Sequence, residues 1–291
     1  MTSIAETVND ESTYKKEFLF TDKDFSYLSN LAGELAGISM PSGKRELIYG
    51  RLVKRLRVLR LKNFKEYCDY LDQDGSEERT HFINAITTNV TSFFRENHHF
   101  DFLAETLLPE LVRKKSTESR PRLRIWSAGC SSGKEPYSIA MVLRESVPDI
   151  DRWDARILAT DLDSNILEVA KAGVYPKEHL KEVALGQYRR WFKMGKGVNE
   201  NSIKVTDDIK QMVTYKKLNL TESWPMKGKF DIIFCRNVTI YFDRDTRIKL
   251  LDRFADYLNE GGCLFVGHSE SLFGLTQRFN TIGRTIHGKV R

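Results

Sequence analysis

The feature of this sequence that most restricts its fold is an alternation of strand-like and helical segments that begins after Pro121. The strand-like runs are RLRIWSA (122–128), ARILATD (155–161), MVTYKKL (212–218), FDIIFCR (230–236) and GCLFVGH (262–268). Between several of them lie stretches with helical periodicity, at 134–145, 164–172 and 245–258. This alternation predicts an α/β fold with a parallel sheet covered on both faces, whose ligands bind beyond the carboxyl ends of the strands.

The stretch 174–208 breaks the alternation. It has helical character to about Phe192, followed by a glycine-containing turn, MGKGVNE (194–200), and a further strand pattern, SIKVT (202–206). We interpret it as an insertion that carries a small antiparallel β-subdomain, over about 174–212.

The residues before Pro121 have helical periodicity. The first helix is expected to begin after Thr21 or Asp22, with Asp24 in its first turn. Further helices are expected over 44–59, 64–71, 77–88 and 96–112. The charged run RKKSTESRPR (113–122) is suited to an exposed connection.

These patterns divide the chain into four expected parts. They are a disordered leader at 1–20, a helical N-terminal domain at 21–95, a linker helix and connection at 96–120, and an α/β domain at 121–291. The leader is polar and lacks the apolar segment of a secretory signal. Since no run of about 18 apolar residues occurs, no helix is expected to span a membrane.

The cysteines and histidines argue against disulfides and metal. Cys68, Cys130, Cys235 and Cys263 are far apart and form no C-x-x-C pair, which fits a reducing cytoplasm. His98 and His99 are adjacent, a poor spacing for chelation from one helical face. We therefore expect a cytoplasmic protein without a metal site.

The ends of the first two strands indicate a nucleoside cofactor. The first strand runs into the glycine-containing loop SAGCSSG (127–133), where a ligand can approach the backbone closely. The second ends at Asp161, whose carboxylate can accept hydrogen bonds from two ribose hydroxyls. The loop is neither G-x-G-x-x-G nor a P-loop, which disfavours dinucleotides and nucleoside triphosphates. The alternative is an ordinary glycine turn followed by a helix-capping aspartate.

The fourth strand runs into FCRNVTIYFD, which places Arg236, Asn237 and Tyr241 at its carboxyl end. An arginine at the end of a buried strand requires an anion to hold. A surface arginine with a packed tyrosine is the alternative.

The segment TTNVTSFFRE (87–96) is polar and aromatic and lies between two predicted helices. Asn89 and Thr91 are suited either to helix caps or to contacts with an adenosyl or methionyl group. Arg95 could hold a carboxylate in a bidentate pair.

Six segments, in their order and spacing, resemble the chemotaxis receptor methyltransferases, the CheR family. They are TTNVTSFFRE, IWSAGCSSGKEPYSIA, ATDLD, NLTE, FDIIFCRNVTIYFD and GHSESL. The resemblance covers nearly the whole chain after about residue 20. It implies a small all-helical N-terminal domain and a Rossmann-like domain that binds S-adenosylmethionine, with an inserted antiparallel β-subdomain.

The resemblance also implies a function, which is methyl transfer from S-adenosylmethionine to glutamate carboxylates of chemoreceptors. A monomer recruited to membrane receptor arrays is expected, without nucleic acid as a partner. In some members the β-subdomain also grips a C-terminal receptor tail, and the turn 194–200 is short here, as in those members.

Carried over by motif, the implied cofactor contacts are Asn89, Thr91, Arg95, Glu135, Asp161, Asn219, Leu220, Arg236 and Asn237. Arg95 and Tyr241 would lie nearest the transferred methyl group and act in catalysis. One departure from the family is Lys134, where an acidic residue is common. Because Glu135 follows it, the cofactor site is expected to persist.

A basic helix suggests how a partner is bound. Between Lys44 and Lys62 there are eight basic residues and one acidic residue, a local excess that accounts for the net charge of +6. Arg51, Lys54 and Arg57 are expected to point away from the apolar stripe, with Arg55 at its edge. A solvated face is the simplest interpretation. Docking on glutamate-rich receptor helices is the alternative that we favour.

Two other functions fit parts of the sequence. A nucleic-acid methyltransferase would explain the basic helix, but CRNVTIYF replaces the Asn/Asp-Pro-Pro-aromatic motif usual in amino-methylating enzymes. A catalytically silent receptor-binding adaptor is the other, and the intact Arg95, Glu135, Asp161, Arg236, Asn237 and Tyr241 argue against it.

Overall fold

The computed structural model describes residues 16–73, 77–115, 117–184 and 186–290. Most of the predicted leader therefore lies outside the described residues. Within these ranges, none of the helices combines the length and the apolar character needed to cross a membrane.

The N-terminal part is a cluster of helices with its own core. The helices are α1 (Asp22–Ala36), α2 (Arg45–Leu59), α3 (Phe64–Gln73) and α4 (Glu77–Ile86), with a 3₁₀ turn, η1 (Ser42–Lys44), before α2. Thr21 and Asp24 form a capping box, which explains why α1 begins at Asp22. The core residues include Leu28, Leu52 and Phe82, all fully buried.

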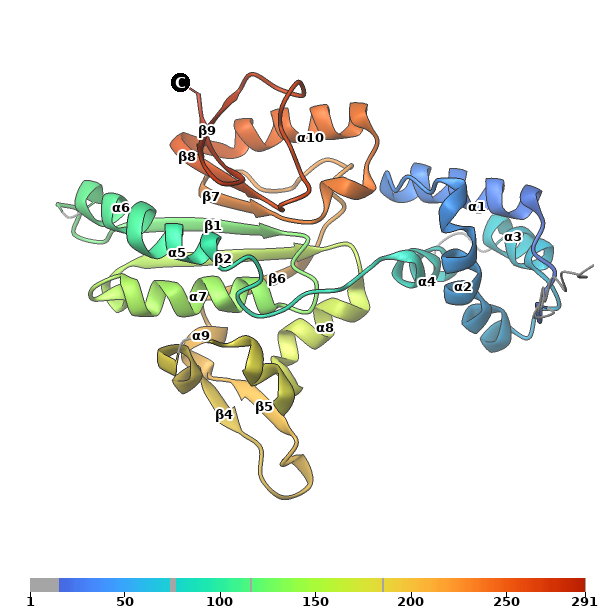
Figure 1. Cartoon of the computed structure of the whole chain (residues 1–291), viewed down its shortest axis with the longest axis horizontal. Helices are drawn as coiled ribbons and strands as arrows, with labels where there is room; N and C mark the ends of the chain where they lie inside the picture. The colour runs from blue at the N-terminus through green and yellow to red at the C-terminus, as the bar shows by residue number, and fades with distance from the viewer. Residues whose placement is uncertain (1–15, 74–76, 116, 185, 291) are drawn as a thin grey trace, which may run out of the picture.

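The fourth helix ends at Ile86, two residues earlier than predicted. The guanidinium of Arg51 accounts for this end, because it donates hydrogen bonds to the carbonyls of Ile86 and Thr87 and to the Thr88 hydroxyl. The chain then leaves the helix as an extended linker, and Figure 1 shows the linker reaching the second part of the molecule.

The second part contains a seven-stranded sheet in the order β6-β2-β1-β7-β8-β10-β9. The five strands expected from the sequence pair in parallel; they are β1 (Arg122–Ala128), β2 (Asp154–Asp161), β6 (Val213–Lys217), β7 (Phe230–Cys235) and β8 (Leu258–Val266). The strands β9 (Phe279–Gly283) and β10 (Ile286–Lys289) were not predicted and pair antiparallel. The sheet is therefore mixed. Strand β9 has the sequence FNTIG and its three central residues are exposed, so no alternating apolar pattern marks it.

Helices cover both faces of this sheet, as the alternation predicts. On one face, α7 (Lys134–Ser146) packs with a continuous helical segment. This segment consists of α5 (His98–Phe102), the π-helical stretch η2 (Leu103–Leu107) and α6 (Leu108–Lys115). On the other, α10 (Arg244–Tyr257) packs on Trp126. Helix α8 (Ser164–Ala172) follows β2. Successive side chains of β1 point to opposite faces of the sheet. Ile125 packs in the core on the α7 side, and Trp126 packs in the core on the α10 side.

The insertion forms a separate antiparallel sheet, as expected. Its strands are β3 (Val174–Pro176), β5 (Ser202–Val205) and β4 (Phe192–Met194), in that spatial order, and Figure 1 shows it projecting below the main sheet. Between β3 and β4 the described chain forms 3₁₀ turns, η4 (Lys177–Glu182) and η5 (Gly186–Trp191). Strand β6, which corresponds to the predicted run MVTYKKL, lies outside this sheet and pairs with β2 at the edge of the main sheet.

The helical domain contacts the second part at the carboxyl edge of the sheet. The Asn219 side chain donates a hydrogen bond to the carbonyl of Leu35 at 2.8 Å, and the Ser39 amide donates to the carbonyl of Tyr241 at 2.8 Å. Gly37 ends α1 in the left-handed conformation, with φ of 67°. A Cβ on Gly37 would lie 2.5 Å from a methyl carbon of Thr221, so the contact requires glycine.

Replacement by alanine should have opposite effects at two glycines, one inside α1 and one at its C-cap. Gly37→Ala should lower the free energy of unfolding by about 1–2 kcal/mol from the left-handed backbone alone, and by more from the clash. Gly33 lies inside α1 with nothing near its missing Cβ, so Gly33→Ala should raise that free energy by about 0.5–1 kcal/mol. Urea unfolding of both variants tests this, and equal shifts would contradict the assigned backbone roles.

Candidate functional site

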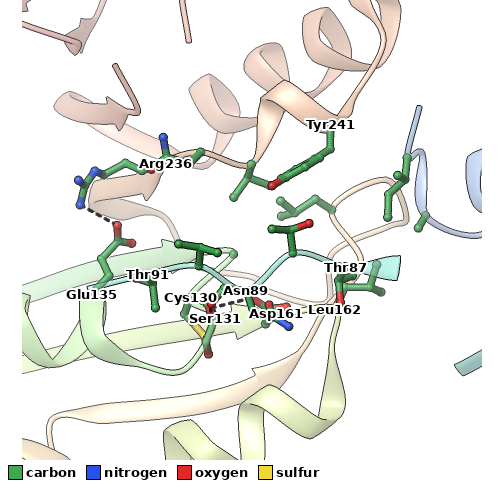
Figure 2. A pocket seen from close by; sticks show the side chains of 18 of the residues that line it. Thr87, Asn89, Thr91, Cys130, Ser131, Glu135, Asp161, Leu162, Arg236 and Tyr241 are labelled. Atoms are coloured by element: carbon green, nitrogen blue, oxygen red, sulfur yellow. Dashed lines mark hydrogen bonds and ion pairs between the residues drawn. The ribbon is translucent and has the colours of Figure 1, made fainter. Parts of the chain in front are cut away.

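A pocket lies where the carboxyl ends of β1, β2, β6 and β7 meet the helical domain. Its floor comes from the loop after β1, from Asp161 and from the segments after β6 and β7. The opposite side is formed by Ala36 and Ile38 at the end of α1 and by the linker from Ile86 to Arg95. The pocket is thus built by both domains (Figure 2).

The structure brings together every residue that the sequence nominated for cofactor contact or catalysis. The pocket lining includes Asn89, Thr91, Arg95, Glu135, Asp161, Asn219, Leu220, Arg236, Asn237 and Tyr241. The four cations nominated for docking, Arg51, Lys54, Arg55 and Arg57, are not among the lining residues.

The loop after β1 is fastened to the end of β2. The amides of Gly129 and Cys130 both donate to the carbonyl of Thr160, at 2.8 and 2.9 Å. Gly129 has φ of 81°, and a Cβ there would collide with the Val238 side chain. The backbone of this loop therefore approaches the segment after β7 as closely as only glycine allows.

Asp161 lies at the base of this loop. Its carboxylate accepts hydrogen bonds from the backbone amides of Ser131, at 2.7 Å, and Asp163, at 3.0 Å. Burial raises the pKa of Asp161, while these amides oppose the shift. Each carboxylate oxygen has two lone pairs, so the group keeps acceptor capacity toward the pocket.

Arg236 is the centre of the charged network on the other side of the pocket. Its side chain is 2% exposed and lies 3.0 Å from the carboxylate of Glu135 and 3.4 Å from that of Glu96. It also donates a hydrogen bond to the carbonyl of Arg95. The anion that an arginine at a strand end requires is therefore supplied by the protein itself (Figure 2).

The two carboxylates around Arg236 have opposite pKa shifts. Burial raises the pKa of Glu135, although Arg236 and the Ser127 hydroxyl oppose it. Burial also disfavours ionisation of Glu96, but the hydrogen bond from His268 and the charge of Arg236 together outweigh it and lower its pKa to about 2. Glu96 is thus an anion at neutral pH.

The linker is held against the sheet by its polar side chains. The side-chain amide of Asn89 donates to the Asp163 carboxylate at 2.7 Å, and the main-chain carbonyl of Asn89 accepts from the Ser131 hydroxyl at 3.1 Å. Asn89 and Thr91 cap no helix, because α4 ends at Ile86 and α5 begins at His98. The helix-cap interpretation of these residues is therefore wrong, and both face the pocket.

Tyr241 closes the pocket from above. It ends a 3₁₀ turn, η7 (Thr239–Tyr241), and Figure 2 shows its ring across the cavity from Asn89 and Asp161, with the hydroxyl directed inward. The Lys44 ammonium lies 5.3 Å from the ring centroid, a cation–π contact from the helical domain.

Asn219 has less freedom than the other nominated residues. Its side-chain nitrogen donates to Leu35 and Glu222, and its side-chain oxygen accepts from Thr221. Because the side chain is engaged in this way, contact with a ligand would come from its main chain.

The basic helix α2 divides its cations between internal contacts and solvent. Arg55 forms two hydrogen bonds with the buried carboxylate of Glu78, at 3.0 and 2.5 Å. Arg51 holds the end of α4 instead of pointing away from the domain, so the expectation for Arg51 is wrong, whereas the half-buried Arg55 was expected at the edge of the apolar stripe. Lys54 is exposed, and Arg57 is exposed and paired with Glu17.

Several residues of the site were missed by sequence reasoning. Ser131, Cys130 and Val238 line the pocket, and Glu96 joins Arg236 to His268. Ser131 and Cys130 lie inside the glycine-containing loop, so the loop pattern could have nominated them. Burial raises the pKa of the Cys130 thiol well above its ordinary value, which makes it a poor nucleophile.

Comparison with known proteins agrees with this architecture. Residues 89–287 match the family described as CheR methyltransferase, SAM binding domain, and residues 23–87 match CheR methyltransferase, all-alpha domain. A "Probable chemotaxis protein methyltransferase" of Rhizobium etli is 44% identical over 254 residues, covering 87% of this chain and 94% of the relative. Chemotaxis protein methyltransferase 2 of Pseudomonas aeruginosa is 41% identical over 273 residues, covering 94% and 95%. The chemotaxis protein methyltransferase of Escherichia coli is 41% identical over 270 residues, covering 92% and 91%.

Proposed function

This chain belongs to the CheR methyltransferase family and binds S-adenosylmethionine, and we propose that it methylates glutamate side-chain carboxylates of chemoreceptors. The products are glutamate methyl esters and S-adenosylhomocysteine. The observation that supports this proposal is the pocket between the two domains, whose lining includes Arg95 and Tyr241 together with Asp161, the proposed acceptor for ribose hydroxyls. The protein acts in the cytoplasm as a monomer and is recruited to membrane receptor arrays by protein contacts.

The residues of the pocket have distinct roles in holding the cofactor. Asp161 accepts hydrogen bonds from the ribose hydroxyls, and the loop after β1 allows close approach of the ligand to the backbone. The other proposed contacts are Asn89, Thr91, Arg95, Glu135, Asn219, Leu220, Arg236 and Asn237. Since Glu135 and Arg236 form an ion pair, Arg236 does not present an unpaired charge to the pocket.

The chemistry requires positioning rather than proton transfer. A glutamate carboxylate, with an ordinary pKa of about 4.3, is ionised at neutral pH and attacks without a base. A carbon–oxygen bond forms as the carbon–sulfur bond breaks, and the electron pair of that bond stays on the departing thioether. Orienting two reactants for such a displacement contributes about 7–11 kcal/mol.

Arg95 and Tyr241 are the proposed catalytic residues. Among the described residues, the side chain of Arg95 has one hydrogen bond, from Nη1 to the carbonyl of Val90 at 2.8 Å, which leaves Nε and Nη2 for a substrate carboxylate. The ring of Tyr241 can pack against the sulfonium, and its hydroxyl can orient the attacking oxygen.

The protein should transfer radiolabelled methyl from S-adenosylmethionine to receptor-containing membranes. Alkali should release the label as methanol, because carboxyl methyl esters hydrolyse readily. Membranes without receptors are the control. Tight cofactor binding without receptor labelling would contradict the proposed acceptor, and labelled RNA in a parallel reaction would favour a nucleic-acid methyltransferase.

Substitutions of the two catalytic residues separate their roles. Arg95→Ala should lower kcat on receptor about a hundredfold, the scale expected when a reactant is misplaced by about 1 Å. If the ring of Tyr241 contacts the sulfonium, Tyr241→Phe should retain most of the methyl-transfer activity. If the hydroxyl is required, Tyr241→Phe should lose as much activity as Tyr241→Ala. The assay is single-turnover transfer, with S-adenosylhomocysteine affinity measured in parallel. An unchanged rate for Arg95→Ala would exclude its proposed role.

The basic helix α2 is the proposed receptor-docking surface, through Arg51, Lys54, Arg55 and Arg57. Because Arg51 and Arg55 also hold the domain together, only Lys54 and Arg57 suit a test of docking alone. A receptor tail could in addition pair with an edge strand of the insertion, β3 or β4.

The double variant Lys54→Glu plus Arg57→Glu should raise KM for receptor without changing S-adenosylhomocysteine affinity. The effect should shrink as ionic strength rises, because salt screens exposed charges. Arg156→Glu plus Lys171→Glu, two exposed cations outside α2, is the matched control. Equal KM values for the two double variants would remove α2 from the docking surface.

A further inference from the structure

The segment GHSESL (267–272), which follows β8, contains a buried carboxylate with unusual partners. Glu270 is 6% exposed. Its Oε1 accepts hydrogen bonds from the Val238 amide at 2.9 Å, the Thr239 amide at 2.6 Å and the Thr239 hydroxyl at 2.8 Å. Its Oε2 accepts from the amides of Asn237, at 2.7 Å, and Gly267, at 2.6 Å.

These donors are neutral groups. Across the described ranges, Glu270 forms no ion pair with a lysine, arginine or histidine. A buried carboxylate is expensive unless its lone pairs are satisfied, and consecutive backbone amides form a natural nest for an anion. The amides of residues 237–239 are such a nest, and Glu270 occupies it.

The nest depends on a strained residue. Asn237 has φ of 58°, in the left-handed region, which residues with a Cβ adopt at a cost that is smallest for asparagine and aspartate. A Cβ on Gly267 would lie 2.8 Å from the Asn237 amide nitrogen and 2.8 Å from Glu270 Oε2. The two segments therefore touch at Gly267, and the hydrogen bonds of Glu270 hold Asn237 in its strained conformation.

The residues held in this way form one wall of the pocket. Arg236, Asn237, Val238 and Tyr241 all line it, whereas Glu270 lies behind them and does not. We infer that Glu270 is a positioning residue, which sets the backbone from Asn237 to Tyr241 in the geometry that binds S-adenosylmethionine. This inference rests on the proposed function only for the identity of the ligand.

The donors of the nest favour glutamate over glutamine, which has the same size, and over aspartate, which has the same charge. Glutamine would replace one acceptor oxygen by an amino group, which would face amide donors instead of accepting from them. Aspartate is one methylene shorter and cannot reach both sides of the nest from the same backbone position. An uncharged or shorter side chain should therefore release Asn237 from its strained conformation.

Glu270→Gln should weaken binding of S-adenosylhomocysteine by about tenfold to a hundredfold, because the pocket wall moves. The probe is S-adenosylhomocysteine itself, measured by calorimetry on the full chain. No acceptor is present, so the result does not depend on which substrate is methylated. The control is Glu78→Gln, which neutralises another buried glutamate, 3% exposed, in the helical domain. It should lower the melting temperature but leave the affinity unchanged.

Gly267→Ala is the second variant, in case Glu270→Gln does not fold. It removes no hydrogen-bonding group, and its Cβ presses on the contact between Asn237 and Glu270. It should also weaken binding, while Gly43→Ala, where a Cβ meets nothing, should not. If either Glu270→Gln or Gly267→Ala folds and binds S-adenosylhomocysteine like the unaltered protein, Glu270 has no positioning role. An equal loss of S-adenosylhomocysteine affinity in Glu78→Gln and Glu270→Gln would also overturn the positioning role, since both losses would then reflect reduced stability alone.

Discussion

The buried guanidinium of Arg236 is the interaction on which the architecture of the site depends. It joins β7 to α7 through Glu135 and to the linker through Glu96 and the carbonyl of Arg95. These segments are far apart in the sequence, and a buried cation is tolerable only where all its anionic partners are present together. The same charges that allow Arg236 to be buried therefore also fix the position of Arg95 beside the pocket.

Several residues in or next to the walls of the pocket have a strained backbone conformation. Ser131, Asn237 and Glu96 all have positive φ without being glycine. Each is restrained by a neighbouring hydrogen bond, Ser131 by Asp161, Asn237 by Glu270, and Glu96 by His268. Strained residues of this kind persist only where their surroundings over-determine them. The polar network thus stabilises a pocket shape that the backbone alone would not adopt.

The sequence could predict the parts of this site that depend on local patterns. Apolar runs located five parallel strands, and chain order placed Asp161 and Arg236 at their carboxyl ends, because parallel strands must end at one edge. The partners of Arg236 could not be read locally, since Glu135 and Glu96 meet it only after the chain folds. The same holds for Arg51, whose helical position suggested that it points away from the domain but whose length lets it reach the C-terminal end of α4. Arg55, expected at the edge of the apolar stripe, reaches Glu78 on α4. The strands β9 and β10 carry too few apolar residues to show an alternating pattern.

The helical domain forms one wall of the pocket and also holds the linker in place. Arg51 lies on α2 and bonds to the start of the linker, and the linker reaches Asn89 two residues after Thr87. Asn219 and Ser39 add hydrogen bonds across the domain boundary. A partner bound to the exposed cations of α2 would therefore be attached to the same packed unit that closes over Asp161. With a receptor docked on α2, the chain of contacts from α2 to the linker would hold the acceptor and the cofactor on a common frame, which is what an in-line transfer between two separately bound reactants requires.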